Sequence, residues 1–242
     1  MENLIFGIRP VAEAIEAGRQ FEKLYIRKGA EGQLMMELKD LIARHRLRYQ
    51  EVPVEKLNRL TRGNHQGVVA VVAAIAYVEL QDILDRVPDD ETPLIVAFDG
   101  VTDVRNFGAI ARSAECAGAH GLITPLKNSA PVNAEAIRSS AGALPTIPVW
   151  RVGSLRNTAK QLQLEGFQVV AATEKSRKLL YDADFRKPTV IVMGSEDTGI
   201  SKELLKLCDE QLAIPLIGHI ESLNVSAAAA VMLFEVVRQR IG

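Results

Sequence analysis

The sequence predicts an α/β protein with two domains, the larger of which is a parallel sheet with helices on both faces. In the second half of the 242-residue chain, strand-like apolar stretches alternate with stretches of helical period, which is typical of a parallel sheet. A shorter alternation of the same kind fills residues 1–76. Between them, residues 77–93 are rich in acids and contain Pro88 and Pro93, which indicates a linker with a short helix at residues 80–86. The second domain then comprises residues 94–242.

The first domain has the pattern of a small α/β unit. Helices are expected at residues 8–17, 34–47 and 54–60, and strands at residues 21–27, 50–54 and 68–76. Pro10 favours the first helix, because proline suits the first helical turn. His65 and Gln66 stand between two glycines and favour a turn, and they could also present hydrogen-bond donors to a nucleotide.

The second domain alternates more regularly. Strands are expected at residues 94–98, 121–124, 146–150, 168–172, 189–193 and 212–214, and helices at residues 107–117, 133–141, 154–165, 201–207 and 225–240. Ligands of parallel sheets bind beyond the carboxyl ends of the strands. We therefore expect the loops after Phe98, Ala172, Met193 and Ile214 to lie close together.

The bulk composition narrows the class of protein. A net charge of −1 argues against binding nucleic acid through overall charge, although local basic patches stay open. One candidate patch consists of Arg44, His45, Arg46 and Arg48; it is either a solvated helix face or a phosphate-contacting surface. Cys116 and Cys208 match no metal spacing, so we expect no metal and two buried thiols in a reducing compartment. With neither a signal peptide nor a membrane-length apolar run, we expect a cytoplasmic protein without membrane association.

Two strand–loop–helix junctions carry unusual polar residues. In the first, Asn106 is expected to cap a helix, and Arg112 could hold a phosphate or carboxylate bidentately. In the second, Gly194 would let a ligand approach the backbone closely, next to Glu196. The alternatives are an ordinary surface arginine and a plain strand-to-helix turn.

The third junction lies near the end of the chain. Pro215 ends a strand, a loop with Gly218 follows, and Ser222 and Asn224 precede a helical pattern that they could cap. The alternative is simply a capped C-terminal helix. No turn carries a G-x-G-x-x-G or P-loop pattern, which counts against a generic nucleotide-dependent α/β enzyme. No nucleophilic Cys–His arrangement is evident, so these side chains suit binding and orienting.

Together, the junctions resemble the signature motifs of the SpoU (TrmH-like) ribose methyltransferases of the SPOUT class. The motifs read Asn106-Phe-Gly108-x-x-x-Arg112, Gly194-Ser-Glu196-x-x-Gly199 and Ile214-Pro-x-x-Gly218-x-x-x-Ser222-Leu-Asn224-Val-Ser226, in the family's order and spacing. The first domain, with Phe6-Gly7-x-x-Pro10-Val and His65-Gln-Gly, is similar to the family's substrate-binding domain of L30e-like fold. The whole chain is similar to the bacterial 23S ribosomal RNA guanosine-2′-O-methyltransferase subgroup.

The resemblance implies a SPOUT domain with a trefoil knot, which is a rare exception to the rule that chains do not thread loops. It implies S-adenosyl-L-methionine as the cofactor and a homodimer with the C-terminal helix in its interface. The implied cofactor contacts are Thr173, Gly194, Ile214 and Leu223. A departure from the family is Asp197-Thr198, where many members have a glycine after the glutamate; it predicts a stiffer and more acidic loop.

The implied reaction is methylation of a ribose 2′-hydroxyl in RNA, at a guanosine of 23S ribosomal RNA. The implied catalytic residues are Arg112, Asn106, Glu196, Ser222 and Asn224. One alternative is a transfer RNA ribose methyltransferase. Another is a non-catalytic RNA-binding or ribosome assembly factor, against which the presence of the motif residues counts.

Overall fold

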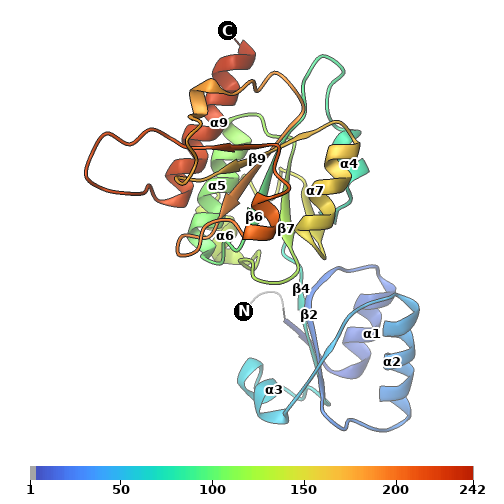
Figure 1. Cartoon of the computed structure of the whole chain (residues 1–242). Coiled ribbons are helices and arrows are strands. Elements are labelled where there is room, and N and C mark those ends of the chain that lie inside the picture. Colours follow the sequence, from blue (N-terminus) through green and yellow to red (C-terminus); the bar gives the residue numbers. More distant parts are fainter. Residues whose placement is uncertain (1–3, 242) are drawn as a thin grey trace. The chain divides into compact units, whose positions relative to one another are not determined.

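The computed structural model of the protein describes residues 4–241. The chain folds as two compact units, the first ending at Ala76 and the second beginning at Tyr77 (Figure 1). The two units have separate sheets, of four and seven strands. Within residues 4–241, no helix is both long and apolar enough to cross a membrane.

The first unit is a four-stranded sheet with helices on both faces. Its elements are β1 (Leu4–Phe6), α1 (Ile8–Glu16), β2 (Phe21–Arg27), α2 (Gln33–Arg44), β3 (Gln50–Val52), α3 (Val54–Leu60) and β4 (Val68–Val72). The strand order is β1-β4-β2-β3, and only the β2–β3 pair is parallel. Helices α1 and α2 cover one face through buried residues such as Ile15 and Leu38, whereas α3 covers the other face through Leu57 (Figure 1).

The turn before β4 uses its polar side chains within the protein. The backbone N–H of Gly67 donates to Nδ1 of His65, at 3.0 Å, and Nε2 of His65 lies 2.9 Å from Oδ1 of Asn58 in α3. Gln66, with a φ of 49°, accepts from the N–H of Ile8 at the start of α1, at 3.1 Å. His65 and Gln66 therefore hold two helix ends, in agreement with the expected turn.

The second unit is a seven-stranded sheet in which every pair of neighbouring strands is parallel. The strand order is β11-β9-β10-β6-β7-β8-β5. The strands are β5 (Tyr77–Val78), β6 (Leu94–Asp99), β7 (Gly121–Pro125), β8 (Val149–Val152), β9 (Gln168–Ala172), β10 (Thr189–Gly194) and β11 (Glu210–Leu212). The helices are α4 (Leu80–Leu84), α5 (Val104–Cys116), α6 (Ala134–Ser139), α7 (Leu155–Leu164), η1 (Leu180–Asp182), α8 (Lys202–Leu205) and α9 (Val225–Ile241). The prediction of a parallel α/β sheet is confirmed.

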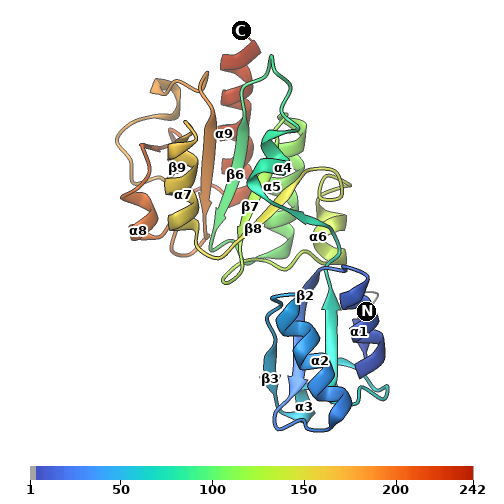
Figure 2. The same cartoon turned by 90° about the vertical axis from the view of Figure 1, so that its right-hand side faces the viewer.

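Helices cover both faces of this sheet (Figure 2). One face packs against α4, α7 and α8, with Ile83, Leu162 and Leu204 buried in a common core. The opposite face packs against α5 and α9, and α5 also packs on α6. The central strands β6 and β10 are buried along their length, as strands covered on both faces must be.

The expectation of a linker at residues 77–93 was wrong for its first part. Tyr77 pairs with Val149 at the edge of the large sheet, and Ile83 is fully buried. The acids in this stretch have local roles: the Trp150 indole donates to Glu79, at 2.9 Å, and Glu79 forms a capping box with Asp82. The short helix expected at residues 80–86 is present as α4, whereas a two-residue strand is too short to produce a clear periodic pattern.

Candidate active site

The loops after β9, β10 and β11 meet at the carboxyl edge of the large sheet and enclose a cavity of about 480 Å³. This volume falls within the range of about 300–1,000 Å³ that is usual for small-molecule sites. The cavity is lined by Ala172, Thr173, Glu174, Lys175, Met193, Gly194, Ser195, Glu196, Asp197, Thr198, Gly199, Leu212, Ile214, Leu216, Glu221, Ser222, Leu223, Asn224, Val225 and Ala228. Three of the four loops that the sequence placed at one edge line the cavity, and the fourth, after β6, lies against the loop after β10 through Asp99 and Gly100.

The lining suits a ligand with both apolar and polar parts. The four predicted cofactor contacts, Thr173, Gly194, Ile214 and Leu223, all belong to it. Ile214 and Leu223 supply apolar surface for a ring system, and the hydroxyl of Thr173 can bond a polar group. A small amphipathic cofactor such as S-adenosylmethionine fits this set of residues.

Gly194 lines the cavity and is also required by a close crossing of the chain. A Cβ atom there would lie 2.4 Å from backbone atoms of both Gly199 and Ile200, so the need for glycine comes from a close chain crossing. Ser195 and Gly199 exchange backbone hydrogen bonds of 3.1 and 2.9 Å, and the hydroxyls of Ser195 and Thr198 lie 2.8 Å apart. This tight loop projects Glu196.

Three predicted catalytic residues form one hydrogen-bonded cluster. The side-chain amide of Asn106 donates to Oε1 of Glu196. Nδ2 of Asn224 lies 3.1 Å from Oδ1 of Asn106 and 3.3 Å from the same Glu196 oxygen. Residues more than a hundred positions apart in the chain therefore share one polar site, and Ser222 lines the cavity beside it.

Asn224 is oriented by the helix that it caps. Its Oδ1 accepts from the backbone N–H groups of Ser226 and Ala227, at 2.9 and 3.4 Å, and from the Ser226 hydroxyl at 2.5 Å. Because Oδ1 faces the start of α9, the Nδ2 group points toward Glu196. The cap predicted for the C-terminal helix is thus present at Asn224.

The prediction that Asn106 caps its helix was wrong. The cap is Asp103, whose Oδ1 accepts from the N–H groups of Arg105 and Asn106, both at 2.9 Å. The helix begins at Val104, so Asn106 lies in its first turn and its side chain is free to reach Glu196. An acid directly before an apolar first-turn residue was the signal for the true cap.

Arg112 lies apart from this cluster. Six residues after Asn106, it lies about 9 Å further along α5 and about 120° around the helix axis. Arg112 is exposed and does not line the cavity. In the hydrogen-bond network of residues 4–241, its guanidinium has no partner.

Sequence reasoning also missed Asp99, at the end of β6. Its Oδ2 accepts from the N–H of Ser201, at 2.7 Å, and so ties β6 to the loop that carries Glu196. The following residue, Gly100, has a φ of 81° and passes against Ser195. An acid at the carboxyl end of a central strand was the available signal.

Cys208 has a structural role. Burial raises the pKa of its thiol to about 12, and the neighbouring carboxylates of Asp209 and Asp99 act in the same direction. The thiol donates to the carbonyl of Leu204, at 3.3 Å. Such a thiol is a poor nucleophile. The expectation that both thiols are buried was wrong for Cys116, which is exposed near the end of α5.

A SpoU-type RNA methyltransferase was expected from the motifs, and this family assignment is confirmed. The chain belongs to the SpoU rRNA methylase family, whose model matches residues 93–234. Residues 4–78 match the family model for RNA 2′-O ribose methyltransferase substrate binding.

Individual relatives cover nearly the whole chain. It is 36% identical over 242 residues to the 23S rRNA (guanosine-2′-O-)-methyltransferase RlmB of Photorhabdus laumondii, with 99% of both chains covered. It is 38% identical to an uncharacterized tRNA/rRNA methyltransferase of Mycolicibacterium gilvum, over 98% of this chain and 76% of the relative. Among solved structures, the SpoU methyltransferase AviRb from Streptomyces viridochromogenes, in complex with the cofactor AdoMet, aligns with a TM-score of 0.63 and 32% identity, covering 98% of this chain and 90% of AviRb.

Proposed function

We propose that this SpoU-family RNA methyltransferase methylates the ribose 2′-hydroxyl of a guanosine in 23S ribosomal RNA, with S-adenosylmethionine as the cofactor. The observation that carries this proposal is the cavity at the ends of β9, β10 and β11, whose lining includes the Asn224 and Glu196 of the polar cluster. The full-length similarity to RlmB supports the RNA and the nucleoside, and the AdoMet complex of AviRb supports the cofactor. The cytoplasmic location stays a prediction.

The cofactor would be held by the predicted contacts. Ile214 and Leu223 offer apolar surface to its adenine ring, and Thr173 and the backbone around Gly194 offer hydrogen bonds. When bound, S-adenosylmethionine supplies an activated methyl group. The remaining task of the chain is to place and activate a ribose hydroxyl.

Arg112 would act on the RNA. A hydroxyl is a weak nucleophile until its proton leaves, and arginine cannot accept that proton because it stays charged in proteins. We propose that the Arg112 guanidinium binds the phosphate next to the reacting ribose and stabilises negative charge developing on the 2′-oxygen. Its exposure leaves it available to a polyanion.

The polar cluster would orient the ribose. Glu196 is fixed by the amides of Asn106 and Asn224, so its carboxylate has a defined direction. We propose that Glu196 and the hydroxyl of Ser222 position the sugar at the cavity mouth. Pre-organised groups of this kind lower a barrier because they need no reorganisation during the reaction.

We also propose a homodimer through α9 and the loop before it. Large apolar side chains are exposed there: Val231 by 37%, Phe234 by 51% and Ile220 by 78%. An apolar surface of this kind is typical of an interface.

For the same unit we propose the trefoil knot, with the chain from residue 213 onward threaded through residues 173–188. This segment bonds to Ala213 through the N–H of Leu180, at 2.8 Å, and to Gln239 through the carbonyl of Ala183, at 2.9 Å. These contacts support the proposal because they hold both ends of the tail against the segment through which it would pass. For the first unit we propose an L30e-like RNA-binding role, with Arg44, Arg46 and Arg48 contacting phosphates.

The test is methyl transfer from labelled S-adenosylmethionine to separate pools of unmodified 23S ribosomal RNA and transfer RNA, with primer extension to map the product. We expect label at a single ribose of the 23S RNA. Label only in transfer RNA would overturn the substrate, and would agree with the tRNA/rRNA designation of the M. gilvum relative. Absence of label from both pools, with the cofactor bound, would overturn the proposed activity.

A further inference from the structure

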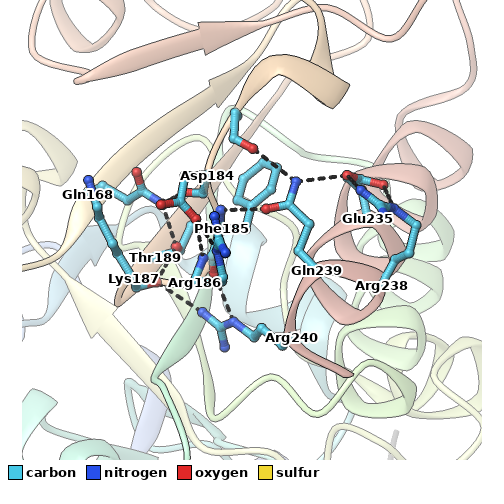
Figure 3. Close-up of polar contacts among 11 residues, drawn as sticks. Gln168, Asp184, Phe185, Arg186, Lys187, Thr189, Glu235, Arg238, Gln239 and Arg240 are labelled. Atoms are coloured by element: carbon cyan, nitrogen blue, oxygen red, sulfur yellow. Dashed lines mark hydrogen bonds and ion pairs between the residues drawn. The ribbon is translucent and has the colours of Figure 1, made fainter. Parts of the chain in front are cut away.

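The C-terminal end of α9 is hydrogen-bonded to the backbone of two other segments, of which Figure 3 draws the one before β10. The Arg240 guanidinium donates to four carbonyls, those of Thr92, Pro93, Phe185 and Lys187, at distances of 2.5 to 3.2 Å. Thr92 and Pro93 lead into β6, and the other two residues lie before β10. A single side chain thus joins three parts of the chain.

Gln239 adds a second contact to the same segment. Its side-chain amide donates to the carbonyl of Ala183 and accepts from the N–H of Phe185, both at 2.9 Å. The amide also donates to Oε1 of Glu235, at 2.8 Å, and Glu235 in turn pairs with Arg238 through two bonds of 2.8 Å. Gln239 therefore pairs with the backbone much as an adjacent strand would. We call Gln239 and Arg240 the C-terminal clamp.

The hydrogen bonds of the clamp compensate for the burial of the Arg240 charge. Burial lowers the pKa of the Arg240 guanidinium, and a desolvated charge is costly without partners. Four carbonyl oxygens compensate that cost here. Phe185 is fully buried between the bonds of the clamp, which fixes this part of the segment further.

The gripped segment continues to the cofactor cavity. At its other end, Thr173 and Lys175 line the cavity. Between the two ends, Leu180 and Ala213 are hydrogen-bonded at 2.8 Å, one residue before the cavity residue Ile214. Residues 173–187 thus connect the clamp to two walls of the cavity.

From these contacts we propose that Gln239 and Arg240 are positioning residues for cofactor binding: they fix the segment 173–187, and through it the cavity walls at Thr173 and Ile214. The proposal rests on the proposed function of the cavity. It predicts that loosening the clamp weakens cofactor binding while the polar cluster, held from α5 and the start of α9, keeps its geometry.

The test compares Arg240→Ala and Gln239→Met with the control Arg238→Ala in the full-length protein. Arg238 lies on the same helix, but among the described residues its guanidinium bonds only to Glu235, and its side chain is 68% exposed. Calorimetric titration measures the dissociation constant for S-adenosylmethionine, and amide hydrogen exchange without cofactor measures the opening of residues 173–187. Steady-state assays separate KM for the cofactor from kcat.

We expect both clamp variants to raise the dissociation constant and KM about tenfold, within the range known for residues that couple to a distant site, with kcat nearly unchanged. Exchange should accelerate in residues 173–187 and stay unchanged in the first unit. Arg238→Ala should bind the cofactor like the wild type. Arg240→Lys keeps the positive charge but has fewer hydrogen-bond donors, so its affinity should fall between those of the wild type and Arg240→Ala.

Faster exchange spread over the whole second unit, without a change in cofactor affinity, would overturn the proposal and leave the clamp a purely stabilising contact. Wild-type affinity in Gln239→Met would also overturn it, and this milder variant decides the matter if Arg240→Ala does not fold. If the wild type binds no S-adenosylmethionine, the proposed cofactor fails, and localised exchange in residues 173–187 still distinguishes a clamp from a general loss of stability.

Discussion

Glu196 is the residue on which the polar cluster converges, because its Oε1 accepts from the side-chain amides of both Asn106 and Asn224. Replacing Glu196 with alanine removes this shared acceptor and frees both amides. We expect the single-turnover rate of RNA methylation, at saturating cofactor, to fall about a hundredfold, which is typical for the loss of one pre-organised polar group.

The neighbouring acid provides the matched control. Asp197 is exposed and lines the cavity, but it takes no part in the cluster, so at saturating cofactor Asp197→Asn should retain nearly the wild-type rate. A Glu196→Ala variant as fast as Asp197→Asn would remove Glu196 from the catalytic machinery.

At this scale, the sequence identified the polar residues of the site better than their local roles. Asn106 was correctly placed in a strand–loop–helix junction, but the cap of its helix is Asp103. The difference is physical: aspartate and asparagine are both good caps, and only the three-dimensional structure decides which of two nearby candidates reaches the free N–H groups.

The α5–α6 crossing depends on Gly108. A Cβ atom there would lie 2.5 Å from Cβ of Ser139 and 2.7 Å from the carbonyl oxygen of Ala136, so a helix would have to move. We expect Gly108→Ala to reduce the free energy of unfolding by about 2 kcal/mol, measured by urea denaturation. As a control, a Cβ atom at Gly153 would meet no atom of residues 4–241 within 4 Å, so Gly153→Ala should be nearly neutral. Equal free energies of unfolding for the two variants would contradict a close helix crossing at Gly108.

Glu235, near the end of α9, makes the free energy of unfolding depend on pH in the acid range. The hydrogen bonds from Arg238 lower the pKa of Glu235, Gln239 acts in the same direction, and burial opposes them. Since the folded-state pKa lies below the ordinary value of about 4.3, the stabilisation is present above that pH and is lost as the pH falls through the folded-state pKa.

We therefore expect the melting temperature of the wild type to fall more steeply than that of Glu235→Gln as the pH is lowered below about 4.3. Thermal unfolding followed by circular dichroism across this range measures the difference. Parallel curves for the two proteins would show that Glu235 does not contribute to the acid response.

Elements of seven or more residues were the predictable ones. The strand at Phe21–Arg27 and the helix at Val54–Leu60 have their expected bounds. The edge strands Leu4–Phe6 and Tyr77–Val78 were not foreseen, because three- and two-residue strands contain too few side chains to establish an alternation.

The exposed side chain of Phe234 on α9 allows a test of the proposed homodimer. If α9 forms the proposed dimer interface, Phe234→Lys should place a charge in it and shift the protein from dimer to monomer, as measured by light scattering after size exclusion. Leu164→Lys is the control, since Leu164 is 89% exposed on α7, outside the proposed interface. A monomeric wild type, or a dimeric Phe234→Lys, would contradict the interface.

The site as a whole could not be derived from local patterns. The Asn106–Asn224 bond spans 118 positions, and periodicity carries no information about which loops meet across such a distance. Two kinds of reasoning supplied the placement: parallel strands gather their carboxyl ends at one edge, and the motifs together resemble one family. Neither kind of reasoning predicted that Arg112 would lie outside the polar cluster and the cavity.

The central claim is that this chain methylates a ribose 2′-oxygen in RNA, and nucleoside mass spectrometry tests it most directly. The protein would be incubated with unmodified 23S RNA and S-adenosylmethionine carrying a deuterated methyl group, and the RNA then digested to nucleosides. The account predicts the deuterated label in 2′-O-methylguanosine with the wild type, and its loss with Arg112→Ala. Label on a nucleobase, or no label in any nucleoside while the cofactor is bound, would contradict it.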